Sequence, residues 1–115
     1  MALRIEEREA GPGRSVIRID GRITLGEAAS AIDALVKRLM REGRHHLIFD
    51  LSGVTHIDST GIGQFIACLN QVRSSGGSLR MAGATGQVRD AFRVTRLDTI
   101  FQFDDDLETA LKALP

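Results

Sequence analysis

The sequence predicts an α/β fold for the whole chain, residues 1–115, as a single domain. A mixed, mostly parallel β-sheet begins with an N-terminal hairpin, and about four helices pack mainly on one face. Three observations lead to this prediction. Segments with helix and strand patterns alternate after the hairpin, and the helical segments are long enough to form crossovers between parallel strands. In addition, 43% of the 115 residues are hydrophobic, which suffices for one core.

The N-terminal segment predicts the hairpin. Residues 3–6 alternate apolar and charged side chains, and residues 16–20 form a β-branched run that Gly21 closes. The Gly-Pro-Gly sequence at residues 11–13 is a turn signal, so the two strands should be antiparallel neighbours.

A helix and a buried strand should follow. From residue 28 to residue 39, apolar side chains recur at the spacing of one helix face, and Gly43 is placed to end that helix. Residues 47–49 are apolar without polar alternation, which is typical of a strand covered on both faces or in the middle of a sheet.

The second half of the chain continues the alternation. Apolar positions from residue 62 to residue 72 predict a helix that the Ser-Ser-Gly-Gly run at 74–77 stops. The remaining elements are, in order, a strand at 78–81, a short helix at 88–92, a strand at 100–103 and a final helix at 107–114 with acids in its first turn.

Composition argues against several functions. Fifteen Lys and Arg balance fifteen Asp and Glu, so no net charge attracts nucleic acid or an anionic membrane. Five Phe, without Trp or Tyr, offer no stacking platform for bases. No apolar stretch approaches the roughly 20 residues of a membrane span. The single cysteine, Cys68, and an acidic N-terminus without a secretory pattern favour a cytoplasmic location.

The most informative segment is residues 58–61, Asp-Ser-Thr-Gly, which joins the buried strand to the start of a helix. Such a start favours capping side chains and anions, because its N–H groups are unpaired and it is the positive end of the helix dipole. Two interpretations are open. Asp58 or Ser59 is a natural N-cap, and capping alone accounts for these residue types. Alternatively, Ser59 is an exposed hydroxyl that a kinase reaches, where a phosphate would add a charge of about −1.5 to −2.

No pattern predicts catalysis. Ser59 lacks a nucleophile-elbow sequence, and the inserted Thr60 and the helical pattern distinguish this segment from the turn of aspartic proteases. One Cys and three His give no zinc spacing, and residues 61–63 lack the lysine of a phosphate-binding loop. We therefore expect a protein that is not an enzyme, without metal, cofactor or catalytic residues, and with Cys68 as an inert residue of the core.

Residues 47–63, with the sequence Leu-Ile-Phe-Asp-Leu-Ser-Gly-Val-Thr-His-Ile-Asp-Ser-Thr-Gly-Ile-Gly, resemble the hallmark segment of bacterial STAS domains, which include the anti-sigma factor antagonists. Residues 76–79, 100–101 and 106–111 fit the same family in the expected order. The resemblance covers essentially the whole chain and implies a small STAS-like domain.

This resemblance implies a regulatory binding module. An antagonist of this kind binds an anti-sigma factor that is itself a serine/threonine kinase, and thereby releases a sigma factor. The kinase phosphorylates the serine after the aspartate, which is Ser59, and a phosphatase reverses the modification. Asp58 and Thr60 are then partner-binding residues beside Ser59, and Gly61 allows close backbone approach.

Two positions depart from the family pattern. Many members carry Asp where this chain has Thr24, and often Gly where it has Arg96. The resemblance implies that members of the family contact a partner, or end a helix tightly, at these positions. Arg22 and Thr24 therefore join the predicted partner-binding residues, while the identity of the partner stays open.

Two other functions are compatible with the same residues. Some STAS domains are subunits of transporter, lipid-trafficking or stress-sensing complexes, in which the domain is a protein-binding scaffold. The anion-favouring helix start would also suit a small-molecule or nucleotide sensor. The sequence leaves the sigma factor, the stimulus and the oligomeric state undetermined.

Overall fold

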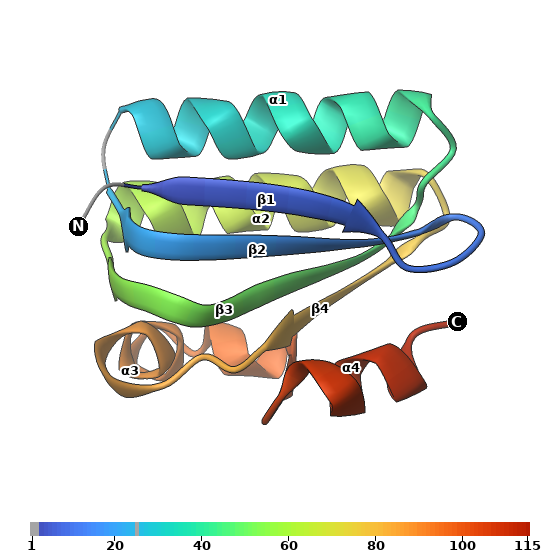
Figure 1. The fold of residues 1–115 in the computed structure, drawn as a ribbon. Coiled ribbons are helices and arrows are strands. Elements are labelled where there is room, and N and C mark those ends of the chain that lie inside the picture. The colour runs from blue at the N-terminus through green and yellow to red at the C-terminus, as the bar shows by residue number, and fades with distance from the viewer. Residues whose placement is uncertain (1–2, 25) are drawn as a thin grey trace.

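The chain follows the predicted order of strands and helices (Figure 1). The computed structural model describes residues 3–24 and 26–115. The strands are β1 (Arg4–Glu9), β2 (Arg14–Ile23), β3 (His46–Ile57), β4 (Ser78–Ala82) and β5 (Gln102–Asp104). The helices are α1 (Glu27–Arg41), α2 (Ser59–Ser74), α3 (Gly86–Val94) and α4 (Leu107–Ala113), with one 3₁₀ turn at Leu97–Thr99.

The strands form one sheet whose spatial order, β1-β2-β3-β4-β5, is also their order in the chain. β1 and β2 are antiparallel, and the other neighbours are parallel, so the predicted hairpin and mostly parallel sheet are confirmed. β3 is the central strand. Its residues 47–51 are all buried, and they include the apolar run at 47–49 for which the sequence predicted burial.

Helices α1, α2 and α3 share one apolar cluster with the sheet. Ile32 of α1, Phe65 of α2 and Phe92 of α3 all belong to it, together with Phe49 of β3. Phe49 and Phe65 meet edge to face, with their ring centroids 5.0 Å apart, a favoured geometry for aromatic pairs. Three of the four helices thus contribute to one core, which confirms that the helices pack mainly on one face.

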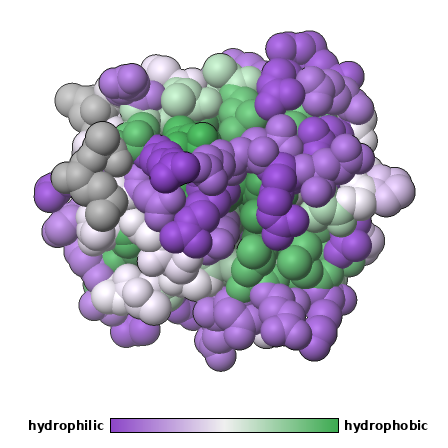
Figure 2. Space-filling view, viewed as in Figure 1, coloured by the Kyte–Doolittle hydropathy of each residue, from purple (hydrophilic) through white to green (hydrophobic). Residues whose placement is uncertain are grey.

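Among the described helices, α4 is the one that covers the other face of the sheet. A smaller cluster joins Val16, Ile48 and Ala82 of the strands to Ala110 and Leu114 at the C-terminal end of the chain. Figure 1 shows α4 on the opposite side of the strands from α1. On the face drawn in Figure 2, apolar surface appears in patches between hydrophilic side chains, with a large patch beside α4. This single short helix therefore leaves part of that face exposed.

The glycine predicted to end the first helix does so. Gly43 has φ 78°, and its N–H donates to the carbonyl of Met40 at 3.1 Å. The N–H of Arg44 donates to the carbonyl of Leu39 at 2.9 Å. These two bonds form a Schellman motif, which needs a left-handed residue and therefore favours glycine.

The last strand is shorter than predicted, because it begins at Gln102 and not at residue 100. The N–H groups of Ile100 and Phe101 both donate to the carbonyl of Leu97, at 3.0 Å each. These two residues therefore close the 3₁₀ turn and do not pair with β4. Phe101 is nevertheless buried in the main core, which explains why its pattern resembled that of a strand.

The departure at Arg96 has a structural consequence. Arg96 has φ 61° and ψ 19°, which is the left-handed region, and among the described residues it is the one non-glycine with positive φ. A side chain in this region crowds the neighbouring carbonyl oxygen, which costs roughly 1–2 kcal/mol. Glycine, which is frequent here in the family that the sequence resembles, avoids this cost.

We expect Arg96→Gly to raise the free energy of unfolding by about 0.5–1 kcal/mol, because relief of the left-handed strain exceeds the added entropy of the unfolded chain. Urea unfolding of the two proteins measures the difference. Arg93→Gly, three residues earlier and inside α3, is the matched control and should lower stability by about 1 kcal/mol. A loss of stability in both variants would contradict the expectation.

Candidate functional site

The candidate site lies where β3 ends and α2 begins. Asp58 is the N-cap residue, with extended backbone, and its Oδ1 accepts a hydrogen bond from the N–H of Gly61 at 2.9 Å. Of the two candidate caps, Asp58 therefore caps the helix. Ser59 is the first residue of α2 and is exposed, while Thr60 is half-buried. The exposed serine thus stands at the positive end of a 16-residue helix.

The end of β2 supports this segment from one side. The N–H of Asp58 donates to the carbonyl of Ile23 at 3.2 Å. Gly61 packs on the same strand end, since a Cβ at Gly61 would lie 2.7 Å from the Ile23 oxygen and 2.8 Å from Cγ1 of Ile57. Gly61 is buried, so the close approach in this structure is to the chain's own backbone. Contact of Gly61 with a partner stays a prediction.

Helix α3 supports the segment from the other side, through a residue that the sequence analysis missed. Oε1 of Gln87 accepts a hydrogen bond from the N–H of Ile57 at 2.9 Å, and Nε2 of Gln87 donates to the carbonyl of Ile57 at 3.0 Å. The two residues are 30 positions apart, so no local sequence pattern marks this contact. The side-chain amide of Gln87 therefore forms the two hydrogen bonds that the backbone of a neighbouring strand would form with β3.

An open hollow of about 560 Å³, here called the α2–α3 hollow, adjoins Ser59. Its lining combines apolar side chains with carboxylates: Ile57, Asp58, Ser59, Ile62, Gly86, Gln87, Asp90, Ala91, Val94 and Thr95. Val94 is 82% exposed, although it is a large apolar residue. Ala91 and Val94 are three positions apart on α3, a spacing that places both on one helix face and that could have identified this surface from sequence.

The predicted partner residues on β2 lie near the same edge of the sheet. Thr24, which is half-buried, directly follows the residue that bonds Asp58. Arg22 is exposed and lies opposite His56 of β3, two residues before Asp58. The carboxyl ends of parallel strands commonly form binding sites. Neither Arg22 nor Thr24 lines the α2–α3 hollow, and their contact with a partner stays a prediction.

Cys68 is buried in α2, as expected for a core residue. Burial raises the pKa of its thiol to about 11, so the sulfur is protonated and weakly nucleophilic near neutral pH. Within residues 3–24 and 26–115, no group of three His, Cys, Asp or Glu side chains is arranged to hold a metal ion. The helices of this part of the chain are also too short or too polar to cross a bilayer.

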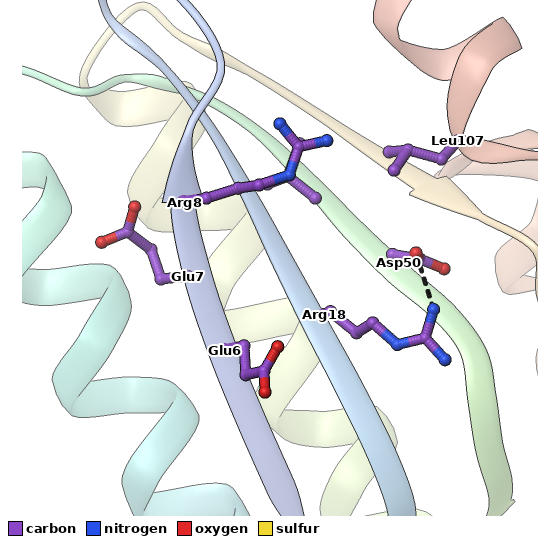
Figure 3. A pocket seen from close by; sticks show the side chains of 7 residues that line it. Glu6, Glu7, Arg8, Arg18, Asp50 and Leu107 are labelled. Atoms are coloured by element: carbon purple, nitrogen blue, oxygen red, sulfur yellow. Dashed lines mark ion pairs between the residues drawn. The ribbon is translucent and has the colours of Figure 1, made fainter.

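A second hollow, of about 310 Å³, lies beside β1, β2 and β3 near the start of α4 (Figure 3). Glu7 points toward α1, where it pairs with Arg38, whereas Arg18 lies next to the buried carboxylate of Asp50. Nη1 of Arg18 is 3.6 Å from Asp50, and Nη2 is 2.9 Å from Asp20. The charge of this guanidinium is thus balanced within the sheet. This hollow shares no lining residue with the α2–α3 hollow.

The chain belongs to the STAS domain family, whose model matches residues 6–110. The match spans the sheet, the junction of β3 with α2, and most of α4. The class that the sequence resemblance implied is therefore confirmed, and the fold agrees with it.

Individual relatives support the same fold. The anti-sigma-B factor antagonist of Staphylococcus epidermidis is 23% identical over 92 residues, which are 80% of this chain and 84% of that protein. The structure of an anti-sigma factor antagonist from Mycobacterium paratuberculosis has a TM-score of 0.84 at 22% identity, covering 98% of this chain and 94% of its own.

Two further structures share the architecture. The Bacillus protein SpoIIAA in its phosphorylated form has a TM-score of 0.76 at 16% identity, covering 96% of this chain and 99% of its own. A sulfate transporter family protein from Wolinella succinogenes has a TM-score of 0.80 at 17% identity, covering 92% and 88% of the two chains. At such identities these likenesses show a common fold, which hosts proteins of different function.

We expect Gly61→Ala to lower the free energy of unfolding by about 1–3 kcal/mol, because the added methyl meets the Ile23 oxygen and the Ile57 side chain. Gly63→Ala, one half-turn later, is the matched control. A Cβ at Gly63 meets no atom within 4 Å, so helix propensity should raise stability by about 0.5–1 kcal/mol. Thermal unfolding followed by circular dichroism measures both, and equal effects of the two variants would refute the packing argument.

Proposed function

We propose that this protein is an anti-sigma factor antagonist, which binds an anti-sigma factor serine/threonine kinase, releases a sigma factor and is switched off by phosphorylation of Ser59. The observation that carries this proposal is the exposed Ser59 at the start of α2, on the edge of a partly apolar hollow. The antagonist relatives support the role, and a phosphorylated form of SpoIIAA, a protein of this fold, supports regulation by phosphorylation. The protein acts in the cytoplasm as a binding module, not as an enzyme, and a phosphatase restores the active form.

Phosphorylation of Ser59 should leave the fold intact. The first turn of a helix has N–H groups without intrahelical partners, and negative charge there is favourable by about 0.3–1 kcal/mol at an exposed site. Ser59 is exposed, so the added phosphate displaces no core side chain. The unmodified and phosphorylated proteins therefore differ in their surface and not in their core.

The same phosphate should disrupt a complex formed at the α2–α3 hollow. Ile62, Ala91 and Val94 offer apolar surface whose burial by a partner is favourable. Asp58 and Asp90 already contribute carboxylates to the lining, so a phosphate of about −2 concentrates negative charge that a docked partner would have to desolvate. Like charges brought together at an interface weaken binding strongly, and this weakening is the proposed switch.

The remaining predicted contacts lie at the junction of β3 with α2, outside the lining of this hollow. Thr60 is next to the acceptor on α2, while Arg22 and Thr24 lie at the end of β2, which bonds to Asp58. We propose that the kinase contacts both this strand end and the hollow, with Ser59 between them. Many family members carry Asp at the position of Thr24, so this surface has one negative charge fewer here. We propose that this difference affects which kinase the protein binds.

We expect Ser59→Ala to bind the kinase as the unmodified protein does, and Ser59→Asp to bind about 100-fold more weakly because of its added charge at the interface. Titration calorimetry with the purified anti-sigma factor of the same organism measures both affinities. Ser74→Asp places the same charge on the exposed last turn of α2 and should bind normally.

Incubation of the unmodified protein with the anti-sigma factor kinase and ATP should add one phosphate, at Ser59. Equal binding of all four proteins, or a phosphate located elsewhere by mass spectrometry, would contradict the switch.

The likeness to the sulfate transporter family protein favours one second candidate, a protein-binding scaffold within a transporter or a related complex. The two candidates predict different partners for the same surface. Purification of the complex from the source cell distinguishes them, because the first requires a sigma-regulating kinase and the second a transporter subunit.

A further inference from the structure

The strand that leads to the acceptor extends beyond its neighbour on one side. β4 pairs with β3 from His46 to Asp50, whereas β3 continues to Ile57. On the other side, β2 accompanies β3 as far as the pair Ile23 and Ile57. The backbone of Ile57 would therefore lack a strand partner on the β4 side, and this is where the amide of Gln87 forms its two hydrogen bonds.

We propose that Gln87 is a positioning residue for the phosphorylation of Ser59. Its side chain holds Ile57, and through Ile57 the next two residues, at a set position relative to α3. The acceptor hydroxyl and the α3 side of the α2–α3 hollow are then presented to the kinase as one rigid unit. This inference rests on the proposed function and adds to it a residue that does not touch the reacting atoms.

The hydrogen bonds around the acceptor support this role, because they link consecutive residues to different elements. Ile57 is bonded at both its N–H and its carbonyl by Gln87 of α3. The N–H of Asp58 is bonded by Ile23 of β2, and the carboxylate of Asp58 caps α2. Ser59 follows directly. Without Gln87, Asp58 would keep its bond to β2, while the backbone of Ile57 would lose both of its hydrogen bonds to α3.

The way α3 is anchored also supports this role. Val88 and Phe92 are its buried residues and pack in the main core, but apolar contacts are not directional and permit small shifts. Within the described part of the chain, the N-cap residue Thr85 makes no side-chain capping bond. The paired bonds of Gln87 at 2.9 and 3.0 Å are directional, so they define where the first turn of α3 lies against β3.

The variant that tests this role is Gln87→Met. Methionine is similar in length to glutamine and forms helices well, but it can make neither of the two amide hydrogen bonds. Gln87 is exposed and Ile57, although mostly buried, lines the open α2–α3 hollow, so we expect water to reach the freed groups of Ile57 and the fold to be retained. Gln102→Met, at an exposed position of β5, is the matched control. Val36→Ala, in the buried face of α1, controls for general loss of stability.

The experiment measures phosphate transfer from ATP to each protein by the anti-sigma factor kinase of the same organism, as a function of substrate concentration. For Gln87→Met we expect kcat to fall about tenfold, because the hydroxyl is misplaced, and KM to change by less than about threefold, because the docking side chains remain. The two control variants should keep the kcat of the unmodified protein. Independently of the kinase, amide hydrogen exchange at Ile57 should become about tenfold faster in Gln87→Met, since its N–H loses its acceptor.

The results separate the positioning role of Gln87 from the proposed function of the protein. Unchanged kcat and KM in Gln87→Met, or unchanged exchange at Ile57, would overturn the positioning role while leaving the proposed function intact. An equal loss of kcat in Val36→Ala would overturn it as well, since it would show an effect of stability alone. If the unmodified protein accepts no phosphate, the proposed function fails and the inference fails with it.

Discussion

The position of Ser59 depends on hydrogen bonds to the backbone of the two residues before it. Gln87 holds Ile57 from α3, and Ile23 holds Asp58 from β2. Asp58 then caps the helix that begins at Ser59. An exposed side chain is normally free to move with its loop, but here the chain is anchored up to the residue before Ser59. A surface serine is thereby held in one place, which recognition by a macromolecular partner requires.

In the proposed switch, this arrangement separates the effect of a phosphate at Ser59 on the fold from its effect on a partner. The start of a helix tolerates negative charge because it is the positive end of the helix dipole and carries N–H groups without intrahelical partners. A partner docked on the α2–α3 hollow would instead have to desolvate that charge beside Asp58 and Asp90. The same group is therefore compatible with the folded protein and unfavourable in a complex. A switch of this kind needs no conformational change.

The rest of the molecule mainly holds this junction in place. β3 is buried along residues 47–51 between the main core and the smaller cluster under α4, so this part of the strand cannot shift without disturbing both, and its end at Ile57 packs in the main core. The same architecture occurs in antagonists and in a transporter family protein. The fold alone therefore does not specify a function, and the surface around Ser59 carries the distinction proposed for this chain.

The order of the elements, the hairpin and the helix end at Gly43 follow from the sequence alone, and so does the choice of Asp58 or Ser59 as the cap of α2. Each depends on periodicity or on hydrogen bonds between residues a few positions apart, which local residue types reveal. Only the tertiary structure showed which backbone Gln87 bonds, that Gly61 has no room for a side chain, and where the α2–α3 hollow lies. It also showed that the last strand begins at Gln102 and not at residue 100. These features depend on which surfaces meet when distant segments pack, and no local pattern records that geometry.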